Sequence, residues 1–175
     1  NSFGGTTITN CYYLNACRVA QGTKVTAEQL KNGEVTKKLQ GDRTDRCYWA
    51  QQLGEMPDFY NAADKSKANY VYYDAAKKGW TCDDFRLTDG QPLPIGLDFT
   101  ATKATYDRTL AAGKATLCLP YELPVQGFKA YTLADRQESR TAVHFKEVNG
   151  TLGAYRPYLL VADAPARLDG ENLQV

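Results

Sequence analysis

The chain has 175 residues, of which 43% are hydrophobic, and it carries 21 Lys and Arg against 20 Asp and Glu. This length suits one full domain or two small ones with a buried core. A net charge of +1 with both signs interspersed argues against nucleic acid as a partner, and no apolar run approaches the ~20 residues that insert across a membrane. Because His144 is the only histidine, a multi-histidine metal site within one chain is excluded. We expect no cofactor and no metal.

The first part of the chain is predicted to contain one short helix. Thr26 and Gln29 have the spacing of a capping box, in which each side chain bonds the backbone of the other residue. Hydrophobic residues follow at near-helical spacing, at Leu30, Val35 and Leu39. This pattern predicts an amphipathic helix over 27–39. Asn32-Gly33 is expected to break it into two turns, because a glycine inside a helix costs about 1 kcal/mol relative to alanine.

Short strands are predicted on both sides of this helix, where β-branched and aromatic residues cluster between turn residues. These strands are Thr7–Thr9, Tyr12–Leu14, Cys47–Trp49 and Asn69–Tyr73. Residues 54–69 are predicted to be irregular. The composition changes at Asp74–Gly79, so we divide the chain there into a small α+β segment over 1–75 and a second domain over 76–175.

The second domain shows one short strand pattern after another with turn signals between them. Strands are predicted at Arg86–Thr88, Phe99–Tyr106, Ala115–Leu119, Phe128–Leu133, Thr141–Val148, Tyr158–Ala162 and Leu173–Val175. Asp89-Gly90 and Asn149-Gly150 are tight-turn dipeptides typical of hairpins. Regular short strands without a long helix predict an antiparallel β-sandwich, and a mainly β fold for the whole chain.

The cysteines argue against a complete disulfide framework, because their number is odd and no CxxC pair is present. They are Cys11, Cys17, Cys47, Cys82 and Cys118. Most are expected to be small buried hydrophobic residues. One disulfide among Cys11, Cys17 and Cys47 stays open as an alternative.

An ordered series of short motifs resembles a known family. Three early motifs resemble the end of GLUG-type repeat regions, which occur in secreted and cell-surface proteins of Bacteroides-like bacteria: Ile8–Leu14, Thr26–Leu30 and Tyr48–Gly54. Later motifs resemble the C-terminal β-domain that often follows such repeats: Leu87–Pro92, Asp98–Ala101, Thr105–Arg108, Leu117–Tyr121 and Ala154–Leu159. That family more often has a small polar residue where Tyr155 stands.

The resemblance implies an exported, modular surface protein and supplies no catalytic residues. The first residue is Asn, and no charged stretch followed by an apolar stretch comes after it. We therefore expect a portion of a longer chain, located outside the cell or on its surface, with neighbouring domains of that chain as partners. Repeat units depend on their neighbours for burial, so residues 1–75 are expected to pack on the second domain or on themselves.

Aromatic side chains are the strongest candidates for a binding site. Trp49 with its neighbour Tyr48, Trp80 at the boundary and the cluster Tyr70–Tyr73 offer flat apolar faces that stack on sugar rings or anchor a partner protein. The alternative is that such strand residues fill the core or pair across strands. We predict a non-catalytic binding or adhesion module with a glycan or protein ligand, and we take Trp80, Trp49 and Tyr48 as its ligand-binding residues. A structural spacer or capping domain is the second hypothesis.

An unrecognised hydrolase is the third hypothesis. A cysteine nucleophile with His144 as its base is one version, but no glycine-flanked elbow surrounds any cysteine. A carboxylate pair drawn from Asp83-Asp84, Asp98 and Glu122 is another, although 20 acidic residues offer such pairs by chance. A calcium site in the acidic loops, at Asp42, Asp45 or Asp83-Asp84, would lack the EF-hand spacing.

Overall fold

The computed structural model describes residues 9–15, 21–134 and 141–175. The mainly β fold predicted from the sequence is confirmed, and the short helices found among these residues all lie in the first half. That half contains β1 (Tyr12–Tyr13), β2 (Thr23–Lys24), α1 (Ala27–Lys31), α2 (Glu34–Gln40), β3 (Trp49–Gln52), β4 (Asp58–Phe59), the 3-10 helix η1 (Ala62–Ser66) and β5 (Tyr70–Asp74). The second half contains β6 (Gly79–Thr88), β7 (Thr100–Asp107), β8 (Gly113–Leu117), β9 (Leu123–Pro124), β10 (Lys129–Leu133), β11 (Phe145–Val148), β12 (Thr151–Leu152), β13 (Tyr158–Ala162) and β14 (Gly170–Gln174).

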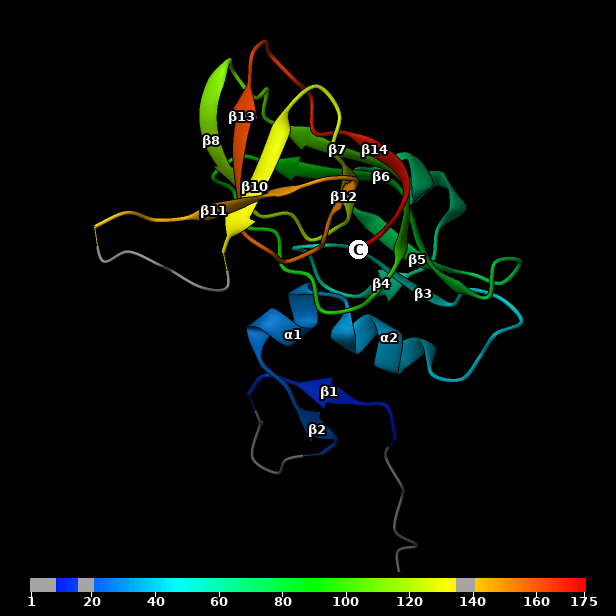
Figure 1. Cartoon of the computed structure of the whole chain (residues 1–175). Helices are drawn as coiled ribbons and strands as arrows, with labels where there is room; N and C mark the ends of the chain where they lie inside the picture. The colour runs from blue at the N-terminus through cyan, green and yellow to red at the C-terminus, as the bar shows by residue number, and fades with distance from the viewer. Residues whose placement is uncertain (1–8, 16–20, 135–140) are drawn as a thin grey trace, which may run out of the picture.

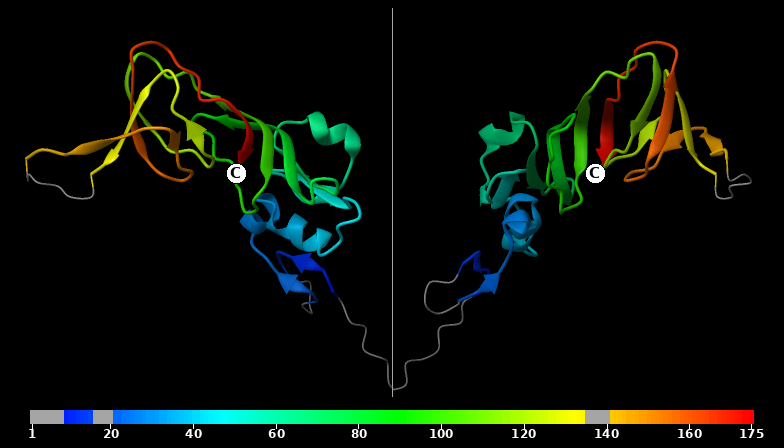
Figure 2. Two further views of the ribbon diagram at one scale, coloured as in Figure 1. Left: turned by 45° about the vertical axis from the view of Figure 1, so that its right-hand side comes forward. Right: turned by 90° about the vertical axis from the view of Figure 1, so that its left-hand side faces the viewer.

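Two larger sheets organise the molecule. One has six strands in the order β14-β7-β6-β5-β3-β4, and the other has four strands in the order β11-β10-β13-β8 (Figure 1). Two-stranded sheets are formed by β12 with β9 and by β1 with β2. The helices α1 and α2 lie between the six-stranded sheet and the β1-β2 pair, whereas β10 and β11 project from the opposite end of the molecule (Figure 2).

Several predicted strands are longer than the observed ones. Strand β3 begins only at Trp49, after Cys47 and Tyr48, and β11 covers only the second half of the predicted Thr141–Val148. The stretch 54–69, predicted as irregular, holds the short elements β4 and η1. Thr7 and Ile8 of the first predicted strand lie outside the described residues. The regular ladder fades at these ends: Tyr48 and His144 still accept backbone hydrogen bonds, from the amides of Tyr60 and Ala134 at 3.0 Å each, but the assigned strands begin one residue later.

Among the described strands, β6 and β7 run parallel, as do β1 and β2, and the other pairs are antiparallel. The predicted turn at Asp89-Gly90 is confirmed, since the Gln91 amide donates to the Thr88 carbonyl at 3.0 Å and Gly90 has φ +73°. It does not close a hairpin, however. Because β7 runs parallel to β6, the chain must cross back along the sheet through residues 91–98 before β7 begins.

The predicted helix and its break are both confirmed. Thr26 and Gln29 form the capping box, and the helix divides into α1 and α2 at Gly33, which has φ +96°. A Cβ atom at Gly33 would lie 1.8 Å from Leu97 Cδ2, and the Gly96 amide donates to the Asn32 carbonyl at 2.8 Å. The helical pair is therefore fitted against residues 96–97 of the crossover, so this part of the first segment packs on the second.

The large sheet also continues across the predicted domain boundary. Strands β5 and β6 form an antiparallel pair in which Tyr73 lies opposite Trp80 and Asp74 opposite Gly79. The Asp74 carboxylate accepts hydrogen bonds from the amides of Ala76 at 2.9 Å and Lys77 at 3.3 Å, which shapes the turn between these strands. One sheet thus contains strands from both predicted segments, 1–75 and 76–175.

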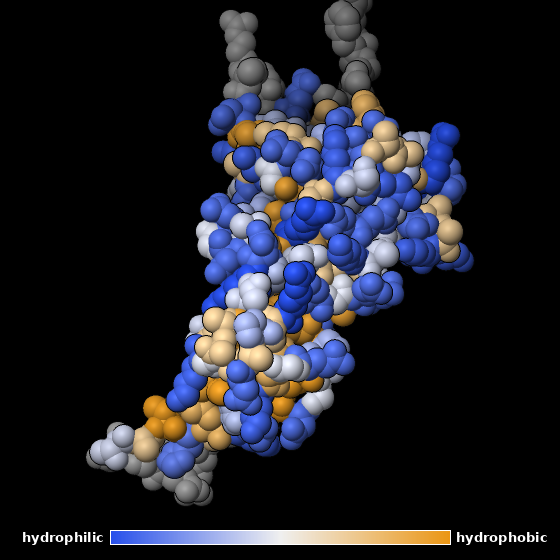
Figure 3. Space-filling view, turned by 90° about the horizontal axis from the view of Figure 1, so that it is seen from above, coloured by the Kyte–Doolittle hydropathy of each residue, from blue (hydrophilic) through white to orange (hydrophobic). Residues whose placement is uncertain are grey.

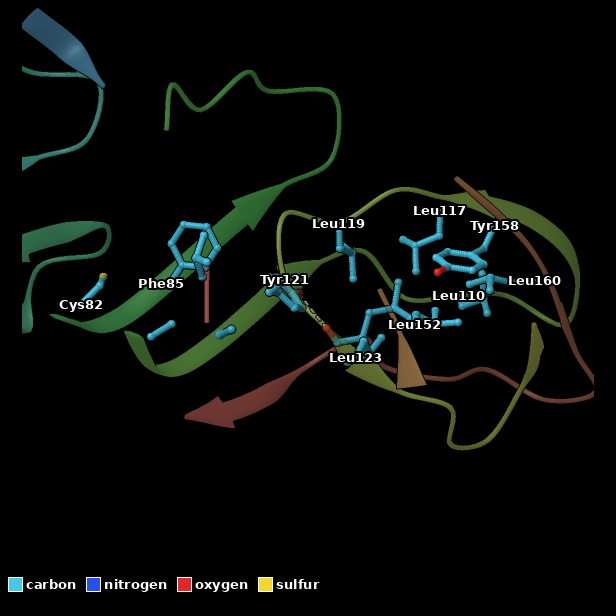
Figure 4. Close-up of a cluster of buried hydrophobic side chains, with 14 of the residues drawn as sticks. Cys82, Phe85, Leu110, Leu117, Leu119, Tyr121, Leu123, Leu152, Tyr158 and Leu160 are labelled. Atoms are coloured by element: carbon cyan, nitrogen blue, oxygen red, sulfur yellow. Dashed lines mark hydrogen bonds between the residues drawn. The ribbon is translucent and has the colours of Figure 1, made fainter. Parts of the chain in front are cut away.

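The two larger sheets share one hydrophobic core. Cys82 and Phe85 come from the six-stranded sheet, and Leu117 and Leu160 come from the four-stranded sheet. Tyr121 lies between the two groups (Figure 4), fully buried, with its hydroxyl donating to the Leu168 carbonyl at 3.0 Å. This shared core gives the molecule a sandwich-like arrangement.

The free thiols differ in their surroundings. Cys82 is buried and Cys47 half-buried, but Cys11 and Cys118 are exposed, so the expectation of buried cysteines is wrong for those two. Cys11 and Cys47 are not bridged, and Cys17 lies outside the described residues. Within the described ranges, no helix is both long and apolar enough to cross a membrane.

Candidate functional site

Four aromatic side chains lie in a row across the neighbouring strands β4, β3, β5 and β6. The strand register places Phe59 opposite Trp49 and Tyr73 opposite Trp80. Ala50 pairs with Tyr72, so the next positions along these two antiparallel strands, Trp49 and Tyr73, also share a face of the sheet. We call Phe59, Trp49, Tyr73 and Trp80 the aromatic row.

The rings of the row contact one another in two pairs. The Trp49 and Phe59 ring centroids are 4.7 Å apart with a tilt of 33°, and Tyr73 meets Trp80 edge to face at 6.1 Å. Such aromatic pairs stabilise a structure by about 0.5–1.5 kcal/mol beyond their burial. The pairing therefore fixes the orientation of the rings.

The two ends of the row differ in exposure. Phe99, which precedes β7 and is 1% exposed, belongs to the core, and the half-buried Trp80 packs against that core. Trp49 and Tyr73 are also half-buried, and Phe59 on the edge strand β4 is 69% exposed. The inner end of the row is therefore anchored in the core, while its outer end faces solvent.

Tyr48 does not join the row, although the sequence predicts it as a ligand-binding residue beside Trp49. The guanidinium carbons of Arg43 and Arg46 lie 4.5 Å and 4.6 Å from the centroid of its ring. Its hydroxyl donates to the Asp45 carboxylate at 3.2 Å. Because the ring is engaged by these cations, Tyr48 contributes to a polar cluster next to Trp49.

Gln40 at the end of α2 positions this segment. Its side-chain amide donates to the carbonyls of Arg43 at 2.7 Å and Arg46 at 2.9 Å. Its side-chain oxygen accepts from the amides of Tyr48 at 2.9 Å and Trp49 at 3.2 Å. Gln40 is 1% exposed, and these four bonds use the full capacity of its side chain.

The thiol of Cys47 connects the two central strands of the row. The Tyr73 amide donates to the sulfur at 3.2 Å, and the sulfur contacts the Trp49 carbonyl at the same distance. Burial raises the pKa of this thiol, so it remains protonated and can donate to that carbonyl. The bonds tie the backbone of β3 at Trp49 to that of β5 at Tyr73.

Only Tyr73 of the Tyr70–Tyr73 cluster reaches the row. Tyr70 and Tyr72 are buried on the opposite face with Tyr60, and the Tyr72 hydroxyl donates to the Asp83 carboxylate at 2.7 Å. Burial and this carboxylate raise the Tyr72 pKa. These two tyrosines fill a second small core, as the alternative interpretation of strand aromatics expects.

Phe59 and Gln40 are missed by sequence reasoning. Phe59 lies in a stretch predicted to be irregular, and a two-residue strand leaves no alternating pattern to detect. Gln40 gives no signal, because a glutamine at the end of an amphipathic helix is normally solvated. An exposed aromatic residue between Pro57 and the polar stretch that follows is the only available indication of the edge strand.

A second group of exposed apolar side chains lies at the other end of the molecule. Leu133, Val143 and Phe145 are exposed there, and Figure 3 shows hydrophobic residues gathered near the end that carries β10 and β11. An apolar cavity of about 370 Å³ beside them is lined in part by Tyr131 and Leu159. This surface is on the four-stranded sheet and is distinct from the aromatic row.

Several residues that the hydrolase and calcium alternatives would use are engaged in side-chain interactions or lie on an exposed segment. Asp83 accepts from Tyr72, and Asp84 pairs with Arg86 at 2.6 Å. His144 lies on the exposed segment before β11. Across the parts of the chain that the structure describes, no group of three or more His, Cys, Asp or Glu side chains could hold a metal ion.

Comparisons with known proteins identify no relative. No family model matches the sequence, and neither the curated proteins nor the solved structures contain a match to the chain. The assignment of function therefore depends on the site itself.

Proposed function

We propose that this chain is a non-catalytic, extracellular binding module of a bacterial surface protein, and that its aromatic row stacks against a glycan. One observation supports this most: aromatic residues occupy matched positions on four neighbouring strands, and the outermost, Phe59, is 69% exposed. Burying an exposed aromatic ring against a flat apolar face is favourable, and the C–H faces of sugar rings provide such a face. The extracellular location is the part of this proposal that the resemblance of the sequence motifs to surface proteins supports.

The length of the row suits a short oligosaccharide. Neighbouring strands lie about 4.8 Å apart, so a row across four strands extends over about 14 Å. An extended ligand lying across the strands would meet the rings in succession. Because the inner rings are anchored against the core, the ligand would order few side chains on binding, which keeps the entropic cost low.

Polar groups beside the row suit the hydroxyls of a glycan. Arg43 and Arg46 are exposed, and Asp45 lies within the same cluster around Tyr48. Guanidinium groups donate hydrogen bonds and carboxylates accept them. A polar rim around an apolar centre is the usual arrangement of a binding surface.

A glycan array tests the proposal, with Phe59→Ala as the main variant and Phe145→Ala as its control. Both phenylalanines are exposed, but Phe145 lies on the other sheet. We expect Phe59→Ala to weaken binding at least about tenfold and to lower Tm by only a few degrees, because the loss to folding is confined to the ring pair with Trp49. Phe145→Ala should bind normally. Absence of binding above background, or equal binding by both variants, contradicts the proposal.

The hydrolase hypothesis predicts a different result on the same glycans. A binding module leaves its ligand intact, so the glycans bound on the array should show no new reducing ends after incubation with the protein. If the purified chain releases reducing ends, and if a substitution of one acidic residue abolishes this release, the protein is a hydrolase instead.

A further inference from the structure

A cavity of about 550 Å³ lies where the end of β6, the crossover and the segment after β8 meet. Leu87, Leu93, Ile95 and Leu119 contribute apolar side chains to it, and the rings of Tyr106 and Tyr155 form part of its wall. Its volume falls in the range of about 300–1,000 Å³ that is usual for small-molecule sites. We call it the Tyr155 cavity.

Tyr155 has an unfavourable backbone conformation. Its φ is +56°, in the left-handed region, and its amide donates to the Leu119 carbonyl at 2.7 Å. This region costs a residue with a Cβ atom roughly 1–2 kcal/mol, and glycine has no such cost. The side chain is 64% exposed, so its own burial does not account for a tyrosine here. The ring does, however, line the cavity, and strained residues of this kind cluster at functional sites.

The electrostatic surroundings favour a cation over an anion. The residues that line the cavity include no Lys, Arg, Asp or Glu. Burial and the charge of Asp98 raise the Tyr155 pKa, so a carboxylate lies within electrostatic reach of that ring. Beside Tyr106, Asp89 accepts from the hydroxyl at 2.6 Å and lies 3.7 Å from Arg108, so the charges of these two residues largely cancel. Two tyrosine rings add negative faces that attract a cation.

We propose that the Tyr155 cavity binds a small amphipathic amine. The apolar part of the ligand packs on Leu87, Leu93 and Ile95, and its ammonium group faces the rings of Tyr106 and Tyr155. This site is independent of the aromatic row, which lies on the opposite part of β6 and on β3 to β5.

Titration with 2-phenylethylamine at pH 7, followed by NMR or calorimetry, tests the charge preference. The matched probes are 2-phenylethanol, which is neutral, and 3-phenylpropionate, which is an anion. We expect saturable binding of the amine, weaker binding of the alcohol, and binding of the carboxylate at least tenfold weaker than that of the amine. Absence of saturable amine binding, or equal binding of the carboxylate, overturns the proposal.

The variant Tyr155→Gly separates binding from folding. Glycine adopts a positive φ without cost, so this variant should be more stable than the parent chain and yet bind the amine at least tenfold more weakly. Lys78→Gly is the control, because Lys78 is exposed and has φ +53° in the turn between β5 and β6. It should gain stability in the same way and bind normally. A lower Tm for Tyr155→Gly, or unchanged binding, would overturn the assignment.

Cys118 gives an independent readout, since its exposed thiol also lines the cavity. The amine should slow alkylation of Cys118 by iodoacetamide and leave the exposed Cys11 as reactive as before, which peptide mass spectrometry resolves. Equal protection of both thiols, or of neither, would argue against binding in this cavity.

Discussion

Two buried glutamines hold the segment that carries Trp49. Gln40 bonds the backbone of residues 43–49, and Gln51 donates to the carbonyls of Leu30 at 2.8 Å and Glu55 at 2.6 Å while accepting from the Thr36 hydroxyl. A buried polar group that loses its partner costs about 1–3 kcal/mol. The side-chain amides of Gln40 and Gln51 therefore connect the helices to the strand that carries Trp49.

We expect Gln40→Met to lower the free energy of unfolding by about 2–4 kcal/mol, because it removes four hydrogen bonds at once and water can replace only part of them. Gln52→Met is the matched control. Gln52 is exposed on β3, so this change should stay within about 0.5 kcal/mol. Urea unfolding of both variants measures the difference. If the two variants lose similar amounts of unfolding free energy, the hydrogen bonds of Gln40 contribute little to stability.

Cys82 makes stability depend on pH in the alkaline range. Burial raises the pKa of its thiol from 9.0 to about 12 in the folded chain. Below pH 9 both states keep the proton, so the thiol adds no pH dependence. Above it the unfolded chain loses a proton that the folded chain retains, and the free energy of unfolding falls by about 1.4 kcal/mol per pH unit until the folded pKa is reached.

Urea unfolding at a series of pH values from about 8 upward should show this fall. In Cys82→Ala the slope should be shallower but still present, since burial also raises the pKa of Tyr121. An identical slope in the variant and the parent chain would contradict a contribution from Cys82. Alkylation at pH 8 is a second check, because Cys82 should react far more slowly than the exposed Cys118.

At the scale of elements, the break between α1 and α2 fits the crossover closely. Gly33 and Gly54 both have φ +96°, but only at Gly33 would a Cβ atom collide with a neighbour, Leu97. Gly54→Ala should therefore lower the free energy of unfolding only by the conformational penalty of a positive φ, about 1–2 kcal/mol. Gly33→Ala should lower the free energy of unfolding by about 1–3 kcal/mol more than Gly54→Ala does, because its added methyl group overpacks the site. Chemical denaturation of the two variants gives the difference directly, and equal losses would show that Leu97 moves aside freely.

Local features of these elements could be predicted from the sequence, because their causes are local. The Thr26–Gln29 capping box and the break at Gly33 depend on residues within one or two helical turns. Strand β13 occupies the predicted residues 158–162, because its apolar run has partners on both sides.

The candidate site could be predicted only in part, because its geometry depends on strand register. Trp49 and Trp80 are recognisable as aromatic residues in strands, but nothing near them in the sequence shows that β5 aligns them on one face with Tyr73. The parallel pairing of β6 with β7 is equally non-local. At Tyr155 the only signal in the sequence is that the family which its motifs resemble more often has a small polar residue at this position.

At the scale of the whole molecule, a core shared by both larger sheets predicts one cooperative unfolding transition. Strand β6 pairs with β5 on one side and β7 on the other, so residues 76–175 alone would expose an edge of β6 and part of the core. We expect fluorescence of Trp49 and Trp80 and far-UV circular dichroism to give coincident transitions for the full chain. The piece 76–175 should unfold without cooperativity. Cooperative unfolding of that piece at the Tm of the full chain would show two independent domains.

The pairing of β7 with β14, two strands far apart in the sequence, has a consequence for how the protein is made. Strand β7 receives its second neighbour only from β14, where Ala104 pairs with Gly170. At ~5–20 residues per second, a ribosome needs about 3–13 s to travel from one of these residues to the other. Throughout that interval one side of β7 offers unpaired amides and carbonyls to any other nascent chain. Strand β14 is translated after every other described strand of this sheet, so the pairing that covers this side of β7 forms last.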